Sequence, residues 1–249
     1  MKKFNFLKGR NLLLEGLIIF LSVITSFSVQ NVRLNKEKKD NLNEAIVTLG
    51  REISQNIDYS KEHLYQVKNL QYLTKKIVED FSEIDLEEIN SIHSENPFLH
   101  SIDINGDVTY IKQYGESTEL IMFIGWMGWQ PADVFFKSLL NSGALLEIEN
   151  EDLRKEIESI YTIHQERVKG MSEFTLSISN DIEKWFIQNQ NTFNYDIPFG
   201  DVFEIKKNQI LKNHLRRKYN LLYQRISDIE FYIESLQNVI SIINEEYVM

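Results

Sequence analysis

An uncharged stretch near the N-terminus constrains this chain more than any other feature of its sequence. Residues 16–29 carry no charged side chain, while residues 1–10 carry four basic side chains and no acidic one. With residues 12–14 included, the apolar stretch approaches the ~20 residues that a helix needs to cross a bilayer. We therefore predict a basic flank over residues 1–10 and a transmembrane helix over residues 11–34.

Glu15 interrupts this stretch, and two interpretations of it are open. Either Glu15 lies at the level of the lipid headgroups and the span begins after it, which we favour, or its carboxylate lies inside the membrane at high cost. A cleaved signal peptide, with Ser26 and Ser28 at the cleavage site, is a further alternative. The next predicted helix follows without a break, which favours an uncleaved anchor.

Ser22 and Ser26 are the predicted interface of the membrane helix. They lie four residues apart on one helix face, and two small residues at this spacing let helices approach closely. The alternative is that the span merely tolerates two serines. On the first interpretation we expect a homo-oligomer.

The orientation in the membrane is only weakly indicated. Basic residues flank the span on both sides, and Glu37 and Asp40 dilute those on the C-terminal side. The positive-inside rule then gives a small preference for a cytoplasmic N-terminus and a periplasmic C-terminal domain, in a bacterial inner membrane.

The remaining residues, 35–249, are predicted to form one helical domain. Glycine and proline number only 10 and 3, too few for a sandwich or barrel with many turns. Apolar residues recur every three or four positions in a long helix over about 35–81 and in a final helix over about 203–246. Three tyrosines widen the apolar surface of the first helix, which favours a bundle over a coiled coil. The fold class is therefore mainly α, with an N-terminal transmembrane helix and a bundle-like domain.

A small β-hairpin is predicted over about 100–111, after a short helix that ends before Pro97. A two-residue turn at Asn105 and Gly106 would place Ile102 and Val108 on opposite faces of the hairpin. A three-residue loop pairs Ile102 with Val108 and leaves Gly106 in the left-handed conformation. We favour the second register.

Residues 131–168 predict two helices that meet at a corner. Pro131 suits the first turn of a helix lined by Phe135, Leu139 and Leu140, and Gly143 suits a left-handed cap at its end.

An extended link over residues 145–148 and an N-cap at Asn150 should follow the corner. The helix after this cap is expected to run towards Phe186, with a break near Gly170.

The stretch Leu120–Trp129 is the most apolar one after the anchor, and ten residues are too few to span a bilayer. We favour a buried core segment. The alternative is a partner- or ligand-binding aromatic patch formed by Phe123, Trp126 and Trp129.

Several classes of chemistry find no support in the sequence. The chain has no cysteine, which excludes disulfides and thiolate chemistry, and its net charge of -10 argues against nucleic-acid binding. Its histidines form no HExxH motif, and the basic run HLRRKY (residues 214–219) is interpreted as a solvated helix face. We expect no catalytic, cofactor-binding or metal-binding residue, and therefore no enzyme.

Three stretches together resemble a known family: EGLIIFLSVITSFSVQNVR in the anchor, FFKSLLNSGALLEIENEDLRKEIESIY in the corner, and the acidic, Ile-rich final helix. The family consists of uncharacterised, N-terminally anchored, single-pass membrane proteins known mainly from Bacteroidetes. The resemblance implies a helical membrane protein and implies no activity. The region around GWMGW departs from the family's pattern.

These observations predict a membrane-anchored, noncatalytic scaffold, sensor or protein-interaction module. Its partners would be the lipid bilayer, further copies of the chain and a protein of unknown identity. The alternative is a membrane-associated enzyme or effector whose site assembles from scattered residues. A pocket with converging carboxylates or histidines would favour that alternative.

Overall fold

The structure is a computed structural model that describes residues 6–102, 108–113, 119–193 and 197–247. Within the first of these ranges, side chains are described from Phe20 onward, with the exception of Val23. The fold is mainly helical with one small antiparallel hairpin, as the sequence predicts.

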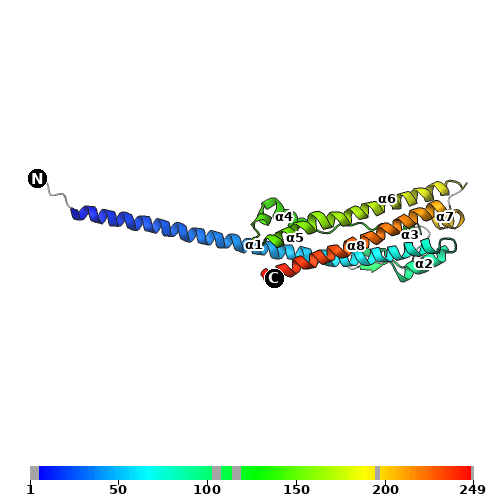
Figure 1. The fold of residues 1–249 in the computed structure, drawn as a ribbon, viewed down its shortest axis with the longest axis horizontal. Helices are drawn as coiled ribbons and strands as arrows, with labels where there is room; N and C mark the ends of the chain where they lie inside the picture. The colour runs from blue at the N-terminus through cyan, green and yellow to red at the C-terminus, as the bar shows by residue number, and fades with distance from the viewer. Residues whose placement is uncertain (1–5, 103–107, 114–118, 194–196, 248–249) are drawn as a thin grey trace.

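A single helix, α1 (Phe6–Glu79, 74 residues), forms both the projecting rod and one side of the bundle (Figure 1). No break separates its two parts, which agrees with the expectation that the predicted anchor and the long helix are continuous. Residues 20–22 and 24–40 are exposed to solvent, whereas Ile46, Leu49 and Ile53 are fully buried. The bundle therefore begins near Leu42, where the 3–4 apolar spacing begins.

Among the residues that the structure describes, no helix has both the length and the hydropathy that crossing a membrane requires. The predicted span over residues 11–34 lies partly outside this description, since nothing is described of the side chains of residues 11–19 and Val23.

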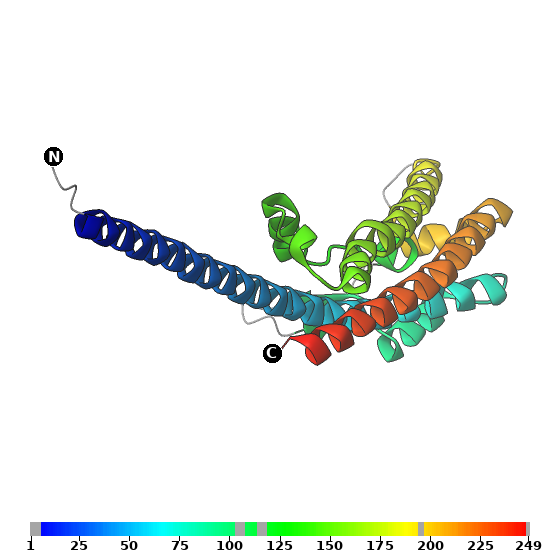
Figure 2. The ribbon, with the colours of Figure 1, turned by 60° about the vertical axis from the view of Figure 1, so that its left-hand side comes forward.

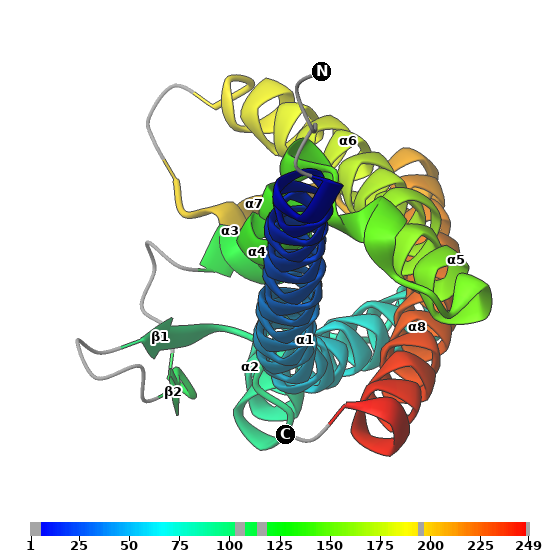
Figure 3. The ribbon, with the colours of Figure 1, turned by 90° about the vertical axis from the view of Figure 1, so that its left-hand side faces the viewer.

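Three long helices build the core. α8 (Gln209–Glu246) lies along α1, and α6 (Gln165–Gln190) packs against α8 (Figure 3). The C-terminus ends beside the point where α1 leaves the bundle (Figure 1). The opposite end of the bundle is completed by three short helices: α2 (Leu86–Glu95), α3 (Glu119–Ile124) and α7 (Phe199–Lys206).

The predicted final helix is two helices. α7 and α8 are separated because Asn208 caps α8, its side-chain oxygen accepting hydrogen bonds from the backbone amides of Ile210 and Leu211. An N-cap residue adopts an extended backbone, which interrupts the helix at Asn208. The prediction of one continuous helix over 203–246 is therefore wrong. The short helix before Pro97 is confirmed as α2.

The hairpin consists of β1 (His100–Ile102) and β2 (Val108–Tyr110). Ile102 lies opposite Val108, which confirms the predicted register. The loop with Gly106 lies outside the described residues. Tyr110 ties the hairpin to α1, because its hydroxyl donates a hydrogen bond to Glu62.

The first helix of the corner is α4 (Val134–Ser142), and it differs from the prediction in two ways. Pro131 precedes the helix instead of lying in its first turn, because Asn56 holds the next residue in an extended segment. Phe136 and Leu139 are buried, whereas Phe135 and Leu140 are 47% and 52% exposed. The predicted apolar face is therefore right at Leu139 and wrong at Phe135 and Leu140.

Gly143 ends α4 with φ 76°, and Asn150 accepts a hydrogen bond from the amide of Leu153, so both predicted caps are confirmed. The link between them is not extended. Residues Ala144–Glu147 form a 3₁₀ turn, η1, because burying Leu145 draws the chain inward.

The second helix of the corner is α5 (Glu151–Ser159), and it leads into α6 through a π-helical turn, η2 (Ile160–His164). The predicted break near Gly170 is wrong, since α6 is continuous there. The irregular turn lies earlier in the chain, where Ile160 and Tyr161 are both buried.

Candidate functional site

The chain between α3 and α4, residues 125–133, has no regular secondary structure and lies against the long helices. Its backbone amides and carbonyls therefore need partners from elsewhere in the protein. Polar side chains on α1 and α8 bind backbone groups of this segment and of the adjoining ends of α3 and α4, and we call these side chains the polar clamp: Glu52, Asn56, Tyr59, Lys218 and Arg225.

Asn56 binds both backbone groups of one residue. Its amide nitrogen donates to the carbonyl of Ala132 at 2.7 Å, and its oxygen accepts from the amide of Ala132 at 2.8 Å. One turn further along α1, the hydroxyl of Tyr59 accepts from the amide of Gln130 at 2.8 Å. These contacts explain why the segment remains extended through Pro131.

Glu52 caps the N-terminus of α4 from a distance. Its carboxylate, 2% exposed, accepts hydrogen bonds from the amides of Phe135 at 2.7 Å and Phe136 at 3.3 Å. The hydroxyl of Tyr161 donates to the same carboxylate at 2.8 Å. A carboxylate at a helix N-terminus is stabilised by the free amides and the helix dipole.

Two buried cations on α8 bind the C-terminal end of α3 and the residues that follow it. Lys218 donates to the carbonyl of Phe123 at 2.5 Å, and Arg225 donates to the carbonyls of Trp126, at 2.5 Å, and Met127. Both side chains are fully buried. Burial lowers the pKa of Lys218 to about 7 and the pKa of Arg225 to about 10, because it disfavours the charged forms.

His63 completes this cluster as a neutral imidazole. Arg225 can only donate, so Nε2 of His63 accepts its hydrogen bond at 2.7 Å and the ring proton lies on Nδ1. Burial, with the charge of Arg225 as a further cause, lowers the pKa of His63 to about 3. His63 is thus unable to gain a proton near neutral pH.

Met127 has a left-handed backbone, φ 55°, which is unusual for a residue other than glycine. Its carbonyl accepts hydrogen bonds from both Arg225 and the hydroxyl of Ser172. The surrounding contacts thus hold a conformation that the residue alone would avoid.

The predicted aromatic patch does not form one surface. Phe123 is fully buried and packs against Phe186 and Phe203, each with ring centroids 5.0 Å away, so it cannot contact a partner. Trp129 is 8% exposed, and Trp126 is half-buried. The core interpretation therefore fits Phe123, whereas a binding role for the two tryptophans stays a prediction.

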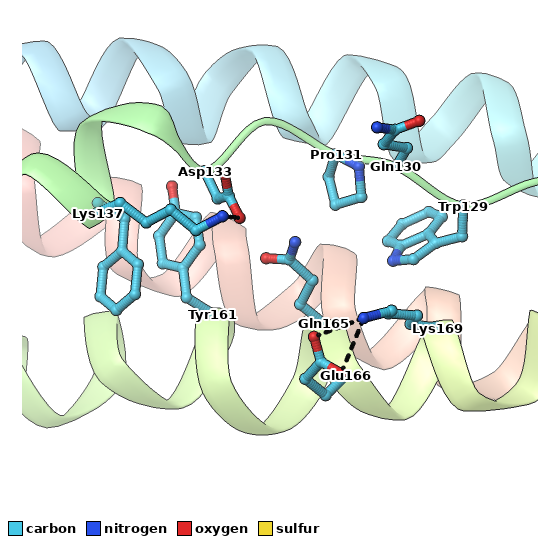
Figure 4. Close-up of a pocket in the computed structure, with 10 residues that line it drawn as sticks. Trp129, Gln130, Pro131, Asp133, Lys137, Tyr161, Gln165, Glu166 and Lys169 are labelled. Carbon is cyan, nitrogen blue, oxygen red and sulfur yellow. Dashed lines mark hydrogen bonds and ion pairs between the residues drawn. The ribbon is translucent and has the colours of Figure 1, made fainter.

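A pocket of about 500 Å³ lies between the extended segment and η2–α6 (Figure 4). Its charged side chains pair with each other: Lys137 lies 2.6 Å from Asp133, and Lys169 lies 3.5 Å from Glu166. The lining residues are Trp129, Gln130, Pro131, Asp133, Phe136, Lys137, Tyr161, Gln165, Glu166 and Lys169.

Two carboxylates, two lysines and a tyrosine line this pocket. No histidine lines it, and each of its carboxylates has a lysine partner. Trp129 Nε1 and Gln165 Oε1 are buried and have no hydrogen-bond partner. The enzyme alternative therefore stays a prediction.

Ser22 and Ser26 lie exposed on one side of the projecting part of α1, together with Gln30 and Arg33. This placement agrees with a shared helix face, and the interface between copies stays a prediction. Among the described residues, no group of three histidine or acidic side chains could hold a metal ion.

The polar clamp was not predicted from the sequence. The signal was present in the helical spacing, because Lys218 and Arg225 occupy the same apolar stripe as Leu215, Leu222 and Ile229. Interpreting the run 214–219 as wholly solvated is wrong for Lys218, whose exposure is 0%.

Comparison with protein-family models, with curated proteins and with solved structures found no match to this chain. The resemblance to the family from Bacteroidetes therefore stays a prediction.

Proposed function

We propose that this protein is a membrane-anchored, noncatalytic interaction module, with its helical bundle carried on α1. One observation carries the proposal: the projecting part of α1 exposes seven large apolar side chains within fifteen residues. Their exposed fractions run from 45% to 70%, and they are Phe20, Leu21, Ile24, Phe27, Val29, Val32 and Leu34.

The distribution of these side chains favours lipid as their partner. At 100° per residue, Phe20 and Val29 lie on opposite sides of the helix, with Leu21 and Val32 between them. A coiled-coil partner covers only one stripe of a helix, whereas lipid surrounds it. The uncharged residues 16–19 extend the apolar segment towards the N-terminus.

The bundle's polar groups support a noncatalytic role. The buried charges of the clamp bind backbone groups, and the charges at the pocket rim pair with each other. Such groups hold a shape. We propose that residues 35–249 present this shape to a protein partner and to further copies, in the periplasm, with the N-terminus in the cytoplasm of a bacterial cell.

The anchor can be tested by fractionating cells that express the full-length protein. The wild type should sediment with membranes and require detergent. Leu21→Arg should weaken insertion by ~2.5–3.5 kcal/mol and shift protein into the soluble fraction. Asn35→Arg adds the same charge outside the span and should remain with membranes. Wild-type protein with an intact N-terminus that is soluble without detergent would refute the proposal.

A further inference from the structure

We infer that η1, the turn of the corner that follows α4, rests in the headgroup layer of the same membrane, as a second lipid contact beside α1. The inference depends on the proposed anchor and adds an orientation to it: the bundle would be held against the bilayer surface at one defined face.

An ion pair fixes the level of the corner along α1. Lys38 Nζ lies 2.8 Å from Glu147 Oε1, so η1 lies beside α1 only four residues past Leu34. At 1.5 Å per residue this is ~6 Å along the helix axis. The headgroup region on each side of a bilayer is roughly 5–7 Å thick. With the span ending at Leu34, η1 falls within that layer.

η1 presents an apolar side chain at this level. Leu146 in η1 is 72% exposed, although its neighbour Leu145 is buried in the core at 1%. The N-terminus of α4 lies further from the membrane, because it is bound by Glu52, which lies ~27 Å past Leu34 along α1. Apolar side chains that enter the headgroup boundary are typical of elements that lie on a membrane.

The figures place the corner at the membrane-proximal end of the bundle. α4 lies beside the point where α1 leaves the bundle and on the side that faces the N-terminus (Figures 1 and 2). Exposed apolar side chains also occur elsewhere, such as Phe174 in α6 and Ile210 in the first turn of α8.

Basic residues on α1 fit a lipid surface at the level of η1. Lys36 and Lys39 lie at the same level as η1 and can approach lipid phosphates, which attract basic residues beside a membrane helix.

The absence of cysteine allows single labelling sites in the full-length chain. Leu146→Cys, Ile24→Cys and Thr192→Cys would each carry an environment-sensitive NBD dye. The proteins would be reconstituted in vesicles of phosphatidylethanolamine and phosphatidylglycerol, with or without lipids that bear a nitroxide near the headgroup. Ile24 reports the anchor, and Thr192 lies exposed beyond the distal end of α6.

The nitroxide should quench the dye at position 146 at least twofold more than the dye at position 192. Quenching at 24 with position 146 equal to 192 would overturn the inference and leave the anchor intact. No quenching at either 24 or 146 would overturn both. Energy transfer between dyes at 146 on two copies, without lipid quenching, would assign the corner to a dimer and also overturn the inference.

Discussion

Single residues in this protein carry charge where the helical pattern expects apolar side chains. Lys218 is the extreme case, because it is fully buried and its ammonium group binds only a backbone carbonyl among the contacts of the described residues. Lys218 holds the end of α3 in place. Because burial lowers its pKa in the folded chain, the free energy of unfolding depends on pH.

Lys218 should make the protein more stable as the pH rises from 7 to about 9.5. Its pKa is about 7 in the folded chain and near 10.5 when unfolded, so between these values the unfolded chain binds more protons. The destabilisation is therefore complete below pH 7 and is relieved above it. Lys218→Met should flatten this rise, as measured by urea unfolding at several pH values.

Lys184→Met is the control, because it removes the same charge from a side chain that is 70% exposed. It should keep the wild-type slope of stability against pH. A Lys218→Met slope equal to that of the wild type would show that Lys218 does not titrate in this range.

At the scale of elements, the corner depends on both a local and a distant cap. Gly143 ends α4 through its own backbone conformation, whereas Glu52 caps the beginning of α4 from 83 residues earlier in the chain. The local cap is visible in the sequence, and the distant cap is not.

Gly143→Ala should destabilise the bundle by roughly 1 kcal/mol, because a side chain is strained at φ 76°. A clash does not contribute, since an added Cβ would meet nothing within 4 Å. Gly170 in α6 has equally open surroundings but an ordinary helical backbone, so Gly170→Ala should stabilise by roughly 0.5–1 kcal/mol. Thermal unfolding of both variants in detergent measures the two changes in stability. If both variants were stabilised, or both destabilised, the cap assigned to Gly143 would be contradicted.

For the whole molecule, the division of α1 into a projecting part and a core part separates two roles. The core part from Leu42 onward is covered within one chain by α8, so copies have no need of it to associate. Association is then expected in the projecting part, where Ser22 and Ser26 share a face.

Replacing Ser22 and Ser26 with isoleucine should abolish a crosslinked dimer in membranes, because larger side chains keep the two helices apart. Ser28→Ile is the control, since it enlarges another face of the same helix. A dimer that survives the double replacement would place the interface in the bundle. A wild type without crosslinks would end the hypothesis of self-association.

The sequence by itself determined the features that depend on neighbours in the chain. The apolar period predicted the core part of α1 and most of α8, and Gly143 and Asn150 predicted their own caps. The pairing of Ile102 with Val108 followed from loop length and side-chain alternation. Each of these rests on contacts within a few residues, which local stereochemistry controls.

Only the tertiary structure decided where α4 begins, which of its phenylalanines is buried, and that Lys218 lies in the core. Asn56 holds Ala132 extended across 76 residues of chain, which moves the start of α4 to Val134 and turns Phe136 inward. The physical reason is that an irregular segment must find partners for its buried amides and carbonyls. Those partners come from whichever helices pack against the segment, and no local pattern in the sequence specifies them.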